Sequence, residues 1–174
     1  MKIVAICGSL RQESYNLKLL QNFAAMLPKT TQYLIEFFHD FPLFNEDVEA
    51  KGIPKPVDEL AQKIALADAI VFGCPEYNYS IPGVLKNGID WLSRHPKKPF
   101  AKKTAAIMGA SPGRLGSARA QYHLRQVGVF LDLRILNRPE IMLSEAHRKF
   151  DEQGNLNDAG AKDLLLQLIQ VLHA

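Results

Sequence analysis

Cysteine is scarce in this chain of 174 residues, which contains only Cys7 and Cys74. Two cysteines cannot build a disulfide framework or a four-thiolate zinc site. Each of them ends an apolar run, so we interpret both as buried free thiols. The five histidines are dispersed, and no pair of them has the spacing of zinc ligands. The sequence therefore predicts no metal site.

A marked excess of one charge and long apolar segments are also lacking. Lys and Arg number 21 against 18 Asp and Glu, and a net charge of +3 is too small and too scattered for a nucleic-acid-binding face. No segment approaches the roughly 20 apolar residues that cross a bilayer. The first apolar run, residues 3–7, is too short for the core of a signal peptide. We therefore expect a cytoplasmic protein with no nucleic-acid partner and no membrane insertion.

Short apolar runs instead alternate with amphipathic stretches. Apolar residues make up 47% of the chain, enough for the core of one domain spanning residues 1–174. Residues 42–56 are expected to form a loop followed by the start of a helix. The pattern predicts strands over 3–7, 33–38, 69–74, 104–109 and 131–136, and helices over 14–27, 56–67, 82–94, 116–130 and 159–172.

This alternation is typical of an α/β fold, a doubly wound parallel sheet with helices on both faces. In such sheets, ligands bind beyond the carboxyl ends of the strands, near the point where the strand order reverses. The segments that follow the first, third and fourth strands are therefore the places to search for a site.

The segment after the first strand, residues 8–16, is rich in groups that bind a phosphate. Ser9, Ser14 and Asn16 offer donors, and Arg11 offers a positive charge just ahead of a helix. The alternative interpretation is a capped helix, with Ser14 as the N-cap and Arg11 on the surface. The segment contains neither a P-loop nor a dinucleotide-binding glycine motif.

A phosphatase site is a further alternative for this segment. Low-molecular-weight tyrosine phosphatases wrap a loop around a phosphate between a nucleophilic cysteine and an arginine. The spacing from Cys7 to Arg11 is too short for that loop, and Cys7 lies within the apolar run. We therefore reject this alternative.

The segment after the third strand, residues 75–83, carries two tyrosines beside an asparagine. Tyr77, Asn78 and Tyr79 suit a flat heteroaromatic ring, because aromatic faces stack on such a ring and amide groups meet its edge. The alternative is that both tyrosines only cover the edge of the sheet. The spacing of the residues does not decide between the two.

Both segments resemble those of the NAD(P)H-dependent FMN reductase family, and most closely its quinone and chromate reductase branch. The first motif is Gly8-Ser9-x-Arg11-x-x-Ser14-x-Asn16, which resembles the phosphate loop of that family. The second is longer and more specific: Pro75-Glu76-Tyr77-Asn78-x-Ser80-x-Pro82-Gly83-x-Leu85-Lys86-Asn87-x-x-Asp90-Trp91-Leu92. Residues 116–126 are also similar to the family.

The resemblance implies a single flavodoxin-like domain, with a five-stranded sheet of order 2-1-3-4-5 and bound FMN. It implies that the FMN phosphate is held by Ser9, Arg11, Ser14 and Asn16, with Leu10 and Tyr15 close by. The isoalloxazine ring would be lined by Pro75, Glu76, Tyr77 and Asn78, and a third loop would contribute Ser111 and Gly113. This third loop departs from the family at Ala110, where relatives often have a hydroxyl, and at Pro112, which lacks a backbone donor.

The resemblance further implies an oxidoreductase that passes a hydride from NADPH or NADH to FMN. The acceptors would be quinones, free flavin, azo compounds or chromate-like anions, in a ping-pong mechanism without a catalytic side chain. Arg114 and Arg119 are candidates for favouring the reduced flavin. The alternative is a non-enzymatic FMN electron carrier of the flavodoxin type.

The family also implies a homodimer or homotetramer. Two glycines, Gly83 and Gly88, lie in one short predicted helix, where each costs about 1 kcal/mol relative to alanine. That cost is explained if something packs closely there. We therefore expect this helix at a dimer contact, which Gly88→Leu would break.

Overall fold

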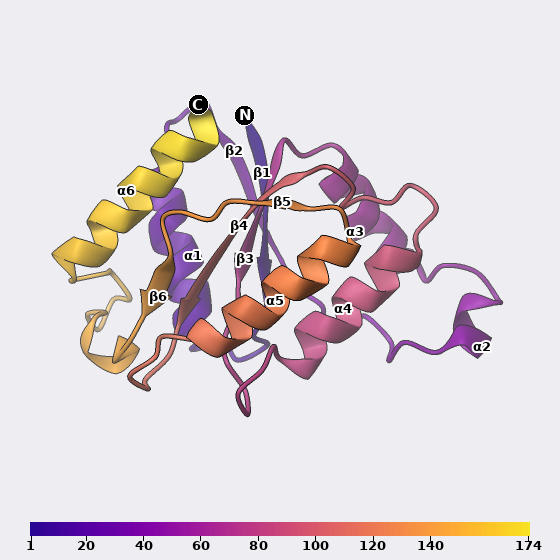
Figure 1. The fold of residues 1–174 in the computed structure, drawn as a ribbon, viewed down its shortest axis with the longest axis horizontal. Helices are drawn as coiled ribbons and strands as arrows, with labels where there is room; N and C mark the ends of the chain where they lie inside the picture. Colours follow the sequence, from indigo (N-terminus) through magenta and orange to yellow (C-terminus); the bar gives the residue numbers. More distant parts are fainter.

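The computed structural model describes residues 1–174 and is built around a parallel sheet covered by helices on both faces (Figure 1). Its main strands follow the order β2-β1-β3-β4-β5, as predicted, and a sixth strand, β6, pairs with β4. The strands are β1 (Lys2–Cys7), β2 (Gln32–Glu36), β3 (Ala69–Gly73), β4 (Thr104–Ala110), β5 (Arg134–Ile135) and β6 (Ile141–Leu143).

The helices divide between the two faces of the sheet. Helices α1 (Tyr15–Met26) and α6 (Ala159–His173) cover one face, while α3 (Lys55–Ala65), α4 (Gly83–Arg94) and α5 (Ala118–Phe130) cover the other. The remaining helical segments are α2 (Glu46–Glu49) and the 3₁₀ turn η1 (Ala146–Arg148). None of the helices combines the length and the apolar character that crossing a membrane requires.

Strand β1 shows why the apolar runs of the sequence are continuous rather than alternating. Ile3 and Ala5 face the core under α1 and α6, while Val4 and Ile6 face the core under the other three helices. All four side chains are inaccessible to solvent. A strand covered on both faces needs apolar residues at every position, and this produces the short runs from which the sheet is predictable.

The last part of the sheet differs from the prediction. The expected strand over 131–136 is reduced to Arg134–Ile135, because Asp132 adopts a positive φ of 55° and the chain turns before it joins β4. Strand β6 was not predicted. It pairs with the far half of β4, where Met108 lies opposite Ile141 and Ala110 opposite Leu143.

The segment between β2 and α3 is more ordered than the predicted loop. It contains the single turn α2, which Asn45 caps through its side chain. Helix α4 fixes this segment: Asn87 Nδ2 and Trp91 Nε1 both donate to the Pro42 carbonyl, at 2.9 and 2.8 Å, and Phe44 N–H donates to Asn87. The Trp91 ring also packs edge-on against Phe44.

Gly88 packs against Phe38 of its own chain, so a second subunit is not needed to explain this glycine, and the dimer contact of α4 stays a prediction. It is buried in α4, and a Cβ atom added to it would overlap the ring of Phe38. The close approach inferred from the sequence is therefore real, but Phe38 follows β2 and belongs to the core of the same subunit. An added Cβ at Gly83 would meet nothing within 4 Å.

We expect Gly88→Ala to lower the free energy of unfolding by about 1–3 kcal/mol, because the added methyl group forces the Phe38 ring out of a filled core. Urea titration measures this difference. Gly83→Ala is the matched control in the same helix and should be neutral or slightly stabilising. Equal stability of the two variants would show that the Phe38 contact does not restrict Gly88.

Candidate functional site

A cavity of about 350 Å³ lies where the segments after β1, β3 and β4 meet. This is the edge of the sheet at which ligands bind in folds of this type. Its walls are formed by Ser9, Arg11, Ser14, Tyr15, Asn16, Pro75, Glu76, Tyr77, Ala110, Ser111 and Pro112. Three predicted site residues, Leu10, Asn78 and Gly113, are next to lining residues in the sequence but do not line the cavity themselves. Ala110 and Pro112, which were noted only as departures from the family, do line it.

The start of α1 forms the first wall. Ser14 is the N-cap, and its hydroxyl accepts a hydrogen bond from the Leu17 N–H at 3.3 Å. The capped-helix interpretation is therefore confirmed, but it leaves the Ser14 O–H and the first backbone N–H groups of the helix available to a ligand. Ser9 is buried and its hydroxyl accepts the Arg11 N–H.

Arg11 is the only cation that lines the cavity. It makes no ion pair, and its guanidinium carbon lies 5.2 Å from the centre of the Tyr15 ring. The one acidic residue in the wall, Glu76, is already paired with Arg119. The cavity therefore combines an unpaired positive charge with the amino end of a helix, and both favour an anion.

Asn16 uses its side chain within the protein. Its Oδ1 accepts the Ala110 N–H, and its Nδ2 donates to the Ala110 carbonyl, both at 3.0 Å. These buried bonds tie the start of α1 to the end of β4. This use was not predicted, because the partner lies 94 residues away in the sequence.

The segment after β3 folds into a hairpin whose loop has two residues. Tyr77 and Ser80 exchange two backbone hydrogen bonds of 3.0 Å, and the central residues Asn78 and Tyr79 have φ values of 49° and 68°. Such a turn normally takes Asn or Gly, because a left-handed conformation costs other residues about 1–2 kcal/mol. The Tyr77 hydroxyl lies 3.3 Å from the Ser9 hydroxyl, which joins the hairpin to the first wall.

Glu76 fixes the base of the hairpin to α5. Its carboxylate accepts the backbone N–H groups of Arg119 and Ala120 at 3.0 and 3.3 Å and pairs with the Arg119 guanidinium at 2.6 Å. It thus caps α5, whose N-cap residue Ser117 is left-handed and makes no capping bond. The Ser80 hydroxyl oxygen lies 3.0 Å from Nδ1 of His123, which is a surface residue of α5. Arg119, a candidate for tuning the flavin, is therefore paired, whereas Arg114 is exposed.

The loop after β4 is held by the residues that follow it in the fold. Ser111 N–H donates to the Leu143 carbonyl, and the Ser111 carbonyl accepts the Ala146 N–H, both at 3.0 Å. The Gly113 carbonyl accepts the Glu145 N–H at 3.1 Å. Strand β6 and the turn η1 thus fix this part of the cavity, a role that the sequence does not reveal.

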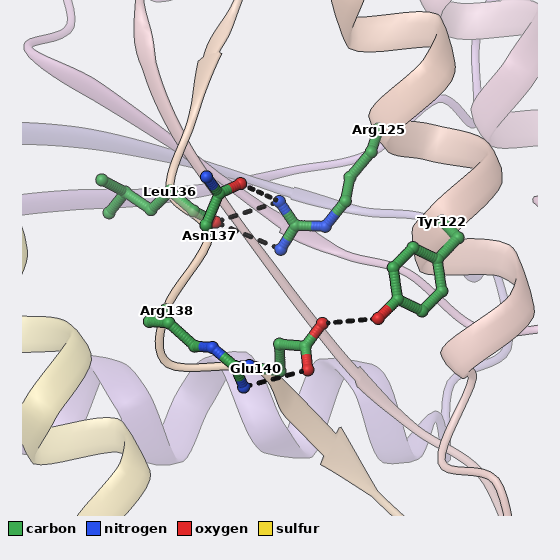
Figure 2. Close-up of polar contacts among 6 residues, drawn as sticks. All are labelled: Tyr122, Arg125, Leu136, Asn137, Arg138 and Glu140. Atoms are coloured by element: carbon green, nitrogen blue, oxygen red, sulfur yellow. Dashed lines mark hydrogen bonds and ion pairs between the residues drawn. The ribbon is translucent and has the colours of Figure 1, made fainter.

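The segment that leads into β6 is itself anchored on α5, as Figure 2 shows. Both terminal nitrogens of Arg125 donate to the Leu136 carbonyl at 3.1 Å. The Tyr122 hydroxyl donates to Glu140 at 2.9 Å, and this contact with a carboxylate raises the pKa of Tyr122. Arg138 also contacts Glu140, at 3.3 Å.

Cys7 is the last residue of β1, and Cys74 directly follows β3. Both are free and buried, as predicted. Burial raises the pKa of both thiols. A thiol that stays protonated is a poor nucleophile, which agrees with the rejection of a phosphatase.

Comparisons with known proteins place the chain in a family. A profile described as NADPH-dependent FMN reductase matches residues 1–148. The chain is 51% identical over 172 residues to an NAD(P)H-dependent FMN reductase from Pseudomonas aeruginosa, covering 99% of this chain and 93% of that protein. It is 42% identical to a quinone reductase from Escherichia coli, covering 95% and 89%.

Among solved structures, the fold is similar to a flavoenzyme NAD(P)H:acceptor oxidoreductase from Paracoccus denitrificans. The TM-score is 0.83, the identity is 30%, and the alignment covers 98% of this chain and 94% of that one. This agrees with the predicted flavodoxin-like fold. The chain therefore belongs to the NADPH-dependent FMN reductase family of oxidoreductases, with FMN as the flavin cofactor and NAD(P)H as the electron donor.

Proposed function

We propose that this single-domain enzyme reduces quinones in a ping-pong reaction, with NADPH or NADH and the acceptor using one site in turn. The observation that carries the proposal is the unpaired Arg11 at the amino end of α1, facing a cavity whose other wall is an aromatic hairpin. The relative from Escherichia coli is named a quinone reductase, which supports this class of acceptor. We extend the proposal to free flavin, azo compounds and chromate-like anions as further acceptors.

The donor groups of the cavity fit the phosphate of FMN. A phosphate ester is an anion with several acceptor oxygens, and the wall offers Arg11, the hydroxyls of Ser9 and Ser14, and the start of α1. Tyr15 would flank the phosphate, and the exposed Leu10 would lie beside it. Asn16 would contribute through its backbone N–H, because its side chain is engaged with Ala110.

The hairpin after β3 forms the second wall of the cavity, and the loop after β4 forms the third wall. Both walls fit the flavin ring. Pro75, Glu76 and Tyr77 would line it on the hairpin side, with Asn78 at the turn, and Ser111 and Gly113 would lie on the opposite side. The redox chemistry, which is acceptance of a hydride from the nicotinamide and delivery of two electrons to the acceptor, would be supplied by FMN when it is bound. The residues of this chain would position the ring, and the Glu76 carboxylate among them is held in place by its contacts with α5.

The electron-carrier alternative is not retained, because the relatives with high identity are named as reductases. We propose a cytoplasmic location, which the two free thiols support.

We also propose assembly as a homodimer or homotetramer. Its support is the exposed end of α5, where Val129 and Phe130 are 81% and 85% accessible. Phe130 also borders a cavity of about 420 Å³ that includes residues of α4.

We expect the purified protein, loaded with FMN, to show a flavin absorption spectrum that bleaches within seconds when NADPH or NADH is added without oxygen. Addition of a naphthoquinone should then restore the spectrum. Comparing the rates of bleaching by NADPH and by NADH at equal concentration shows which donor the enzyme prefers. A flavin spectrum that neither donor changes would contradict the proposed reductase activity.

We expect Arg11→Ala to weaken FMN binding about ten- to a hundredfold, because a hydrogen bond to a charged group contributes about 1.5–3 kcal/mol. Titration of the apoprotein with FMN, followed by flavin fluorescence, measures the Kd. Lys29→Ala removes the same charge at an exposed turn beyond the other end of α1 and should bind FMN normally. An Arg11→Ala Kd equal to that of Lys29→Ala would show that the phosphate lies elsewhere.

A further inference from the structure

Tyr79 occupies a backbone conformation that a bulky residue seldom adopts. Its φ is +68°, at a turn position where asparagine or glycine is usual. Its side chain is also 68% exposed, so burial of the ring does not compensate for the backbone. Neither the local backbone preference nor burial explains a tyrosine here. Strained residues of this kind concentrate at functional sites.

The Tyr79 ring is nevertheless held in one place. The guanidinium carbon of Arg119 lies 3.5 Å from the ring centre, which is a close cation–π contact. The same guanidinium pairs with Glu76, whose side chain is only 8% exposed. A buried carboxylate thus fixes the cation, and the cation fixes one face of the ring.

The Tyr79 ring is connected to the cavity through its neighbours, although Tyr79 does not itself line the cavity. Glu76 and Tyr77, at the start of the hairpin, line the cavity, and only one guanidinium separates the Tyr79 ring from the Glu76 carboxylate. The neighbouring loops at this edge also expose apolar side chains, Leu10 and Leu115. The Tyr79 ring is therefore an aromatic surface that is fixed close to the cavity, and the loops at the same edge of the sheet expose further apolar side chains.

We propose that Tyr79 is a specificity-determining residue that stacks on planar acceptors of the quinone class. The proposal rests on the proposed quinone reductase function. The electron-rich face of a tyrosine attracts an electron-poor ring, and a ring already held by Arg119 loses little freedom when it stacks. A compact acceptor without a flat face gains nothing from this contact.

The test compares two acceptors in the FMN-loaded enzyme with NADPH as donor. A naphthoquinone has a flat ring, whereas ferricyanide has none. Tyr79→Asn removes the ring but keeps a residue suited to the left-handed turn, so the hairpin is retained. We expect the ratio of the KM for naphthoquinone to the KM for ferricyanide to rise about two- to tenfold. Tyr79→Phe keeps the aromatic face and should restore the wild-type ratio.

Tyr79→Gly repeats the test with the residue that tolerates a positive φ best. An unchanged KM ratio in both Tyr79→Asn and Tyr79→Gly would overturn the proposal, as would an equal rise in both KM values, which indicates a purely structural role. These outcomes require a wild-type enzyme that NADPH reduces and a naphthoquinone reoxidises. A wild type that fails in this overturns the proposed function itself, and the role of Tyr79 with it.

Discussion

The site depends on the two hydrogen bonds between the Asn16 amide and the backbone of Ala110. They join the start of α1 to the end of β4, and the contact between Ser9 and Tyr77 adds the hairpin after β3. Because Asn16 and Ala110 are buried, losing either partner would leave a polar group unsatisfied, at about 1–3 kcal/mol for each. A single asparagine therefore holds two loops at the distance that the cavity requires.

The strand order and most of the cavity wall could be predicted from the sequence, because both follow from local patterns. Short apolar runs alternating with amphipathic helices specify a parallel sheet, and such a sheet gathers its ligand-binding loops at one edge. Ser9, Arg11 and Tyr77 each follow a buried strand closely, so they had to lie at that edge. Gly88 was similarly informative, since a glycine within a helix indicated a close approach.

The partners of these residues could not be predicted, because each lies far away in the sequence. Nothing near Gly88 identifies Phe38 as the ring against it, and nothing near Glu76 indicates that its carboxylate caps α5. Strand β6 has only three residues, too few for a periodic signal. Yet β6 and η1 fix Ser111, so the least recognisable part of the chain determines the third wall.

The outer side of β4 is covered by two short strands rather than one long strand. Arg134 and Ile135 pair with its first half, and residues 141–143 pair with its second half. An exposed edge strand is a template on which another chain can add a strand, and the hazard grows with the length of the unpaired edge. By ending the sheet in two separate pieces of two and three residues, this fold leaves no continuous edge there for intermolecular strand pairing and aggregation.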